Sequence, residues 1–129
     1  MKIAVLITRI LLGLIYVIFG FNFFLHFIPL PAMPGPGGDF EGALFKAGYL
    51  FPFMKVIEIA TGVALLINKY TAFFVVLIFP VTVNIFLFHA FLSLEGLPIG
   101  LLMLLINLFL GYAYRKYYSS VFTLTPVVD

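Results

Sequence analysis

Four long stretches of the chain are almost wholly apolar, and short polar or proline-rich breaks separate them. The stretches cover residues 3–25, 49–67, 71–92 and 98–118. A helix needs about 20 predominantly apolar residues to cross the hydrocarbon core of a bilayer, and each stretch has roughly that length. The pattern therefore predicts an all-α integral membrane protein, with one domain over residues 1–129 in which four transmembrane helices form a bundle.

The composition agrees with a lipid environment. Of the 129 residues, 64% are hydrophobic and 9% are charged, whereas soluble domains average about 25% charged residues. The net charge is +2, and the basic residues form no stripe of the kind that neutralises nucleic-acid phosphates. We therefore expect the lipid bilayer as a partner and no nucleic acid. The absence of cysteine excludes disulfides, thiolate metal sites and thiol redox catalysis.

The charged residues in the loops and at the ends of the spans predict the orientation of the bundle. Four basic residues fall on one side of the membrane: Lys2, Lys69, Arg115 and Lys116. The other side carries Asp39, Glu41, Lys46 and Glu95. Because loops rich in Lys and Arg remain in the cytoplasm, we expect a protein of the cell membrane with both termini cytoplasmic. The first apolar stretch is also longer than the roughly 7–15 residues of a signal-peptide core, so we expect it to be retained as a helix.

The loop over residues 26–48 would then lie outside the cell. Its prolines and glycines forbid a continuation of the first helix. Asp39 would suit the N-cap of a short helix that carries Phe40 and Leu44. An ordinary ordered loop remains the alternative.

Several polar side chains fall within the predicted spans, where charges are costly and usually face the bundle interior. From the first span to the fourth they are Arg9, Asn22, Lys55, Glu58, Asn84, His89 and Asn107, with His26 just beyond the first. A rise of about 1.5 Å per residue places Arg9 and Glu58 near the inner end at similar depth, so we expect them to form an ion pair. Lys55 lies one turn from Glu58 and can share its carboxylate. Lys55, Asn84 and Asn107 fall near mid-membrane, and Asn22, His26 and His89 lie near the outer rim.

Small residues share a helix face with these polar groups. They are Gly13 and Gly20 in the first span, Gly62 in the second, and Gly100 and Gly111 in the fourth. Small residues let membrane helices approach closely, so the three stripes are expected to face one another. The resulting polar column has two interpretations: the polar groups only hold four helices together, or they line a binding cavity or proton path that opens outward.

Sharper chemistry is limited by the residues present. His26 and His89 have similar depths and would suit a haem between two helices, but two rim histidines facing water or headgroups are the simpler interpretation, and no haem is expected. No metal site is expected either, because the two histidines and a distant Glu95 offer too few ligands. Some of the 17 phenylalanines could line a quinone pocket.

Three segments resemble the DoxX-like family of small four-span membrane proteins. They are RILLGLIYVIFG from Arg9, EIATGVALL from Glu58, and NIFLFH, which ends at His89. The first is similar to the family's Arg-x-x-x-Gly start with a second glycine at the helix end, and the second to its Glu-x-x-x-Gly-x-x-Leu-Leu pattern. The third matches a histidine that members often carry near the end of helix three. The resemblance covers nearly the whole chain and implies functional roles for Arg9, Glu58 and His89.

Members of that family are membrane partners in redox and stress handling. Some resemble a quinone-linked thiosulfate oxidoreductase subunit, and others assemble with soluble oxidative-defence enzymes. The resemblance implies a subunit that binds a small apolar or quinone-like molecule, or a soluble or membrane redox partner, rather than a complete enzyme. Since the chain has no thiols, electron chemistry would need a quinone or a partner. A transporter or channel subunit that forms homo-oligomers, and a scaffold without ligand, are the alternatives.

Overall fold

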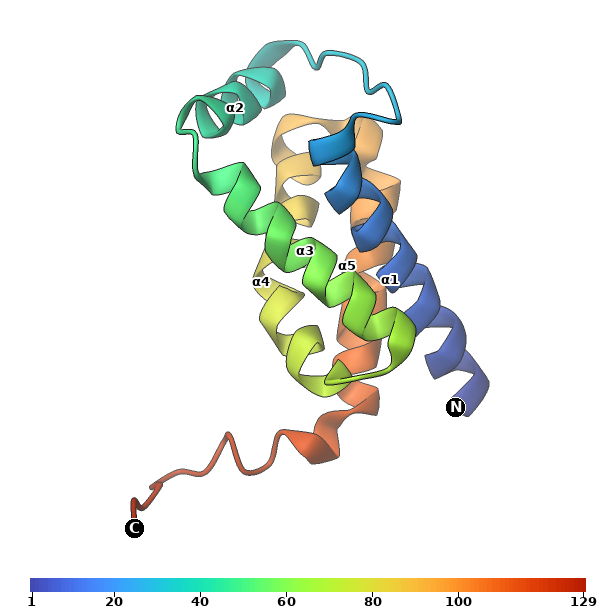
Figure 1. Ribbon diagram of the computed structural model, residues 1–129, viewed down its shortest axis with the longest axis vertical. Helices are drawn as coiled ribbons and strands as arrows, with labels where there is room; N and C mark the ends of the chain where they lie inside the picture. The colour runs from blue at the N-terminus through green and yellow to red at the C-terminus, as the bar shows by residue number, and fades with distance from the viewer.

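The computed structural model describes all 129 residues and contains helices and no strands. Four helical segments are long and apolar enough to cross a membrane, namely α1 (Lys2–Leu25), α3 (Leu50–Ile67), α4 (Thr71–Leu92), and α5 (Leu97–Ala113) with the 3-10 turn Leu94–Gly96 that precedes it. A shorter helix, α2 (Gly35–Lys46), lies between α1 and α3, and a second 3-10 turn, Arg115–Tyr117, follows α5. The prediction of an all-helical membrane bundle is confirmed (Figure 1).

Two boundaries differ from those expected. The fourth span ends at Ala113 instead of residue 118, and the chain beyond it turns across the end of the bundle, where the Tyr118 hydroxyl donates to the Ala72 carbonyl at 2.9 Å. The helix expected in the long loop is present, but Asp39 lies inside it. It begins at Gly35 after Pro34, because Pro36 in the first turn has no N–H that would need a helical partner.

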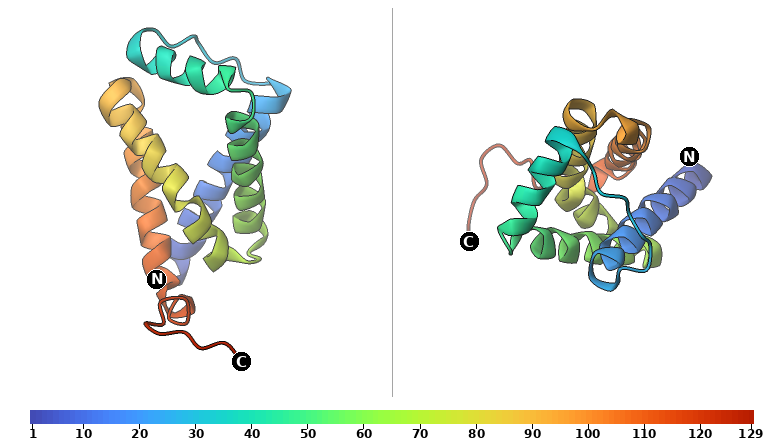
Figure 2. Two further views of the ribbon diagram at one scale, coloured as in Figure 1. Left: turned by 90° about the vertical axis from the view of Figure 1, so that its left-hand side faces the viewer. Right: turned by 90° about the horizontal axis from the view of Figure 1, so that it is seen from above.

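The four spanning helices close into a ring in the order α1, α3, α4, α5. Both termini lie at one end, which we call the basic end, and α2 lies across the opposite end, which we call the α2 end (Figure 1). The half of the bundle nearer the basic end is filled by one apolar cluster: Leu12, Tyr16, Leu65, Val75, Ile78, Met103, Ile106 and Leu110. Towards the α2 end, α3 and α4 diverge beneath α2 (Figure 2).

Glycines bring α1 and α3 into close contact. A Cβ added to Gly62 would lie 2.4 Å from Cγ2 of Val17 and 2.7 Å from the carbonyl oxygen of Gly13. A Cβ on Gly20 would lie 2.6 Å from Cγ1 of Ile59. The first two glycine stripes therefore face each other as expected.

The stripe on α5 does not join them. Gly100 packs on α4, where an added Cβ would lie 3.5 Å from Cα of Phe86, and a Cβ added to Gly111 would meet no atom of another segment within 4 Å. The expectation that all three stripes converge is therefore wrong for Gly100 and Gly111, which face α4 and open space, whereas Asn107 of the same stripe is buried inside the bundle.

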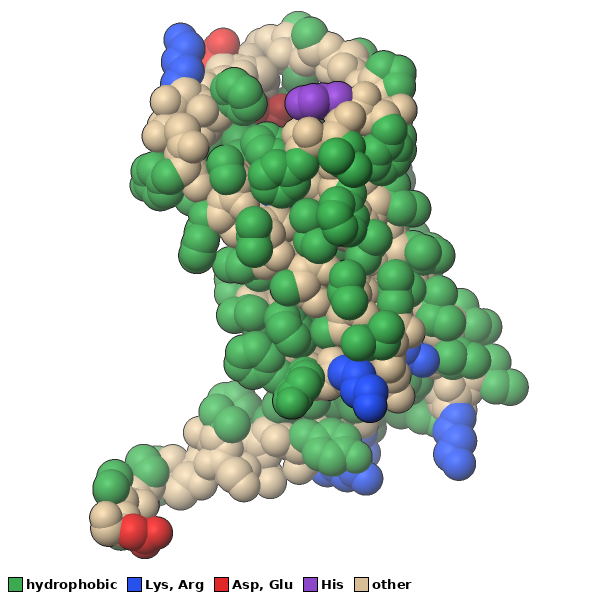
Figure 3. All heavy atoms as spheres, viewed as in Figure 1, with side chains coloured by type: hydrophobic (Ala, Val, Ile, Leu, Met, Phe, Trp, Pro, Cys, Tyr) green, Lys and Arg blue, Asp and Glu red, His purple; other side chains and the backbone are tan.

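The surface divides the molecule into an apolar belt and two polar ends. Hydrophobic side chains cover the sides of the bundle, most Lys and Arg side chains gather at the basic end, and a histidine and acidic groups lie near the α2 end (Figure 3). This distribution is consistent with a multi-pass protein in a lipid bilayer.

Candidate ligand-binding site

A single ion pair lies within the membrane-spanning part of the molecule. The Lys55 amine is 3.2 Å from Oε1 of Glu58, one turn further along α3. Glu58 is only 4% exposed, and no other side chain donates to it. The prediction that Lys55 shares the Glu58 carboxylate is confirmed.

Arg9 does not take part in this pair. Its guanidinium donates to the Leu65 carbonyl, and no carboxylate lies within 4 Å of it. Leu65 is in the last turn of α3, where helical carbonyls lack backbone partners, since the Lys69 N–H bonds to Ala64 instead. Arg9 therefore caps the C-terminal end of α3, where a positive charge is favourable.

The expected ion pair between Arg9 and Glu58 is thus wrong. Glu58 lies seven residues before Leu65, which is about 10 Å along the helix axis. The guanidinium is level with the unpaired Leu65 carbonyl and therefore bonds to it, whereas the Glu58 carboxylate has a nearer partner, Lys55, on its own helix.

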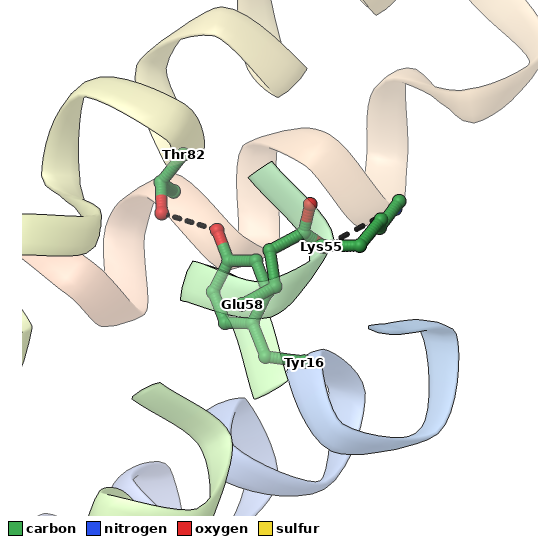
Figure 4. Close-up of polar contacts among 4 residues, drawn as sticks. All are labelled: Tyr16, Lys55, Glu58 and Thr82. Carbon is green, nitrogen blue, oxygen red and sulfur yellow. Dashed lines mark hydrogen bonds and ion pairs between the residues drawn. The ribbon is translucent and has the colours of Figure 1, made fainter. Parts of the chain in front are cut away.

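A chain of hydrogen bonds crosses the bundle beneath the ion pair. The Tyr16 hydroxyl lies 2.5 Å from Oγ1 of Thr82, Thr82 donates to Oδ1 of Asn107 at 2.7 Å, and Asn107 donates to the Val75 carbonyl at 3.1 Å. Because the single Thr82 hydrogen is used towards Asn107, Tyr16 is the donor of the first bond. Figure 4 shows the Tyr16 hydroxyl of α1 directed at Thr82 of α4, with Glu58 beside the tyrosine ring.

These hydrogen bonds show that Asn107 links α4 and α5 and is not part of a polar column. All three side chains are at most 2% exposed. The helix-face pattern indicates that Tyr16 points inward, but nothing in the sequence singles out Thr82 as its partner. The contact depends on how α1 and α4 are rotated about their axes.

The Lys55–Glu58 pair faces a cavity of about 130 Å³ between α2, α3 and α4. Most of the wall is apolar: Phe40, Leu44, Phe51, Met54, Val81, Ile85 and Phe88. The remaining polar groups at its edge are Glu41, Asn84 and His89. An apolar cavity with a few convergent polar groups is the usual form of a small-molecule site.

A second, more open cavity of about 850 Å³ lies beneath the loop that precedes α2. Glu41, Phe51 and Lys55 line both cavities, so the Lys55 side chain, which is 20% exposed, stands where they meet. The larger cavity also includes Asn22 and His26. The two cavities therefore gather most of the predicted polar residues at the α2 end.

The remaining predicted residues differ in what they contact. Asn84 is exposed on α4 at the edge of the small cavity and makes no hydrogen bond within the protein. Nδ1 of His89 lies 3.2 Å from the Ser93 carbonyl, and its ring packs on Gly96, where an added Cβ would lie 2.2 Å from the ring. Asn84 is thus free to bind a ligand, whereas one His89 nitrogen is already used.

Asn22 and His26 have local roles at the end of α1. The Asn22 amide bonds both backbone groups of Ile28, at 3.1 and 2.7 Å, and so fixes the chain as it leaves the helix. His26 is exposed and ends α1 with a left-handed φ of 53°. The two histidines line different cavities, so they do not form the facing pair that a haem needs. No cluster of three or more His, Asp or Glu side chains is placed to hold a metal ion.

Comparison of the chain with family models, curated proteins and solved structures finds no match.

Proposed function

We propose that this chain is a DoxX-like membrane subunit that binds a quinone-like molecule in the cavity between α2, α3 and α4. The observation that carries the proposal is the Lys55–Glu58 pair, in which Glu58 is buried and Lys55 partly buried on a spanning helix, and which faces an apolar, aromatic cavity. Buried charges are costly in a membrane and usually mark function. A bundle whose other half packs through an apolar cluster does not require this pair for its core.

The groups around the cavity match the chemistry of a quinone. The Lys55 amine and the Asn84 amide supply donors for quinone carbonyls, and Glu58 supplies an acceptor for the hydroxyl of a quinol. The Phe40 and Phe88 rings, with centroids 5.9 Å apart, offer apolar faces to the ring of the ligand.

The size and position of the cavity limit how much of an amphipathic ligand it would hold. Ligand pockets usually enclose about 300–1,000 Å³, whereas this one holds about 130 Å³. It would therefore take only the ring of the ligand. Asn84 is exposed on the side of α4, so the apolar tail would leave past it into the bilayer.

The redox role belongs to the same proposal. A bound quinone would exchange electrons with a soluble or membrane partner protein, because the chain has no thiols of its own. We place the basic end and both termini in the cytoplasm and the α2 end outside, following the distribution of Lys and Arg.

The packing near the basic end favours binding over conduction. The apolar cluster fills this half of the bundle, and the Asn107 and Thr82 donors are used within the protein. Below the α2-end cavities the polar side chains Thr61, Thr82 and Asn107 are each at most 2% exposed, so they are packed within this half and do not line an open path. A transporter would need a different packing of this half.

Native mass spectrometry of the purified protein, with an absorbance spectrum and a titration with a short-chain benzoquinone, tests the proposal. The wild type and Glu95→Gln are expected to bind one quinone, since Glu95 is exposed and lines neither cavity. When the titration is repeated with the reduced, quinol form, Glu58→Gln is expected to bind at least tenfold more weakly than the wild type, because the quinol hydroxyl loses a hydrogen bond to a charged carboxylate that contributes about 1.5–3 kcal/mol. A wild type that binds no quinone, or equal binding of the quinol by both variants, would show the proposal to be wrong.

A further inference from the structure

The Arg9 guanidinium carries a charge that no group in the protein neutralises. Arg9 is 8% exposed and lies in α1 among the ends of three helices. A guanidinium has five N–H donors, yet its only acceptor is the Leu65 carbonyl, and no carboxylate lies within 4 Å. Capping α3 accounts for one donor and leaves the others unused.

These donors face a cavity of about 300 Å³ at the basic end of the bundle. Polar groups reach it from three elements: Lys2 and Arg9 from α1, Asn68 from the turn after α3, and Tyr114 from the end of α5. Val5 and Leu6 of α1 add an apolar wall. No acidic side chain lines this cavity, so its field is positive.

The two uncharged polar residues also present donors. Oδ1 of Asn68 accepts from the Thr71 hydroxyl at 2.8 Å, which leaves the Asn68 amide hydrogens free. The Tyr114 hydroxyl has no hydrogen-bond partner in the protein, and burial raises its pKa, although the neighbouring Arg9 charge opposes that rise. The phenol is therefore protonated at neutral pH and can donate.

We propose that this cavity binds the phosphodiester of one anionic glycerophospholipid from the leaflet at the basic end. A guanidinium and a phosphate form strong paired hydrogen bonds, and basic pockets between membrane helices bind anionic headgroups. The apolar wall formed by Val5 and Leu6 continues along the outside of α1 and provides a surface for an acyl chain. That wall favours a lipid over free phosphate as the source of the anion.

A bound lipid would add contacts between segments that meet at the basic end. The cavity spans the start of α1, the α3–α4 turn and the end of α5, and the Arg9 bond to Leu65 joins α1 to the last turn of α3. A ligand that binds only the folded state raises its stability by mass action. This lipid site is separate from the quinone cavity, which lies at the α2 end.

Native mass spectrometry with added phosphatidylglycerol or phosphatidylcholine tests this proposal. The wild type is expected to retain one phosphatidylglycerol about tenfold more tightly than phosphatidylcholine. Lys2→Glu is expected to weaken phosphatidylglycerol binding about tenfold or more. Lys116→Glu removes the same charge from the same end and is expected to change binding less than twofold, because Lys116 is outside the cavity and lies over the Tyr117 ring at 5.0 Å. Both lysines are exposed, so neither variant disturbs the core.

Three results would overturn the lipid site. Equal losses in the Lys2 and Lys116 variants would show diffuse surface attraction, and equal retention of the two lipids would show no charge recognition. Displacement of phosphatidylglycerol by millimolar inorganic phosphate would identify a site for the free anion. In addition, Arg9→Lys keeps the charge but loses the planar donor pair. An unchanged affinity of this variant for phosphatidylglycerol would show that Arg9 does not bind the lipid.

Discussion

Replacing Lys55 by Met would leave the Glu58 carboxylate in a spanning helix without a hydrogen-bond donor. The Lys55 amine, at 3.2 Å, is the only group that donates to it. Removing one partner of a buried ion pair costs about 3–5 kcal/mol. We expect a loss of about 3 kcal/mol in the free energy of unfolding, at the lower end of that range, because the adjacent cavity gives the carboxylate access to water.

The reverse replacement should cost less. Glu58→Leu leaves the Lys55 amine, whose side chain is already 20% exposed and can extend into the larger cavity, so we expect a loss of about 1 kcal/mol. The double variant Lys55→Met with Glu58→Leu should lie within about 1 kcal/mol of the wild type, because a matched apolar pair can replace a buried ion pair. The two single losses therefore should not add.

The measurement is unfolding in mixed micelles with increasing dodecyl sulfate, followed by far-ultraviolet circular dichroism. Additive losses in the double variant, or equal losses in the two single variants, would refute the reasoning about which charge is left stranded. The same double variant separates packing from function. It should fold almost as well as the wild type and no longer bind quinone, and a double variant with wild-type quinone affinity would place the ligand elsewhere.

Three further predictions follow from the packing and the charges. Gly62→Ala should destabilise the fold by about 1–3 kcal/mol through overpacking. Gly111→Ala, whose added methyl meets open space, should be neutral or stabilising by up to about 1 kcal/mol. If both variants lost a similar free energy of unfolding in dodecyl sulfate, the close contact of α1 and α3 would be contradicted. Tyr16→Phe should cost about 1 kcal/mol in the same assay through one lost hydrogen bond, and no change would show that the hydroxyl is not bonded. In a chain without other cysteines, Asp39→Cys should react with an impermeant maleimide from outside the cell and Lys116→Cys only from the cytoplasm; the opposite pattern would invert the topology.

The membrane spans can be read from the sequence because each helix must satisfy its own backbone in lipid and present apolar side chains. The Lys55–Glu58 pair can also be read, since both residues lie on one helix and a spacing of three residues fixes their separation. The glycine contact between α1 and α3 is visible for a similar reason, because Gly13 and Gly62 mark one face of each helix.

Contacts between helices are harder to read. The rise per residue gives the depth of Arg9 but not its partner, and the unpaired carbonyl of Leu65 competes with Glu58 for the guanidinium. The bond between Tyr16 and Thr82 depends on helix rotation, which an almost uniformly apolar helix such as α4 does not encode. The cavity depends on how α2 lies across α3 and α4, and the proline-rich segment before α2 has no periodicity that would place it.

The most direct test of the proposed quinone site is to label the wild-type protein with a photoreactive azido-benzoquinone and to map the labelled peptides by mass spectrometry. The proposal predicts labels on α2 and on the cavity-facing parts of α3 and α4, near Phe51 and Phe88. These labels should disappear with excess unlabelled quinone and in the Lys55→Met, Glu58→Leu double variant. Labels spread over the lipid-facing surface, or labels near Phe51 and Phe88 that persist in the double variant, would contradict it.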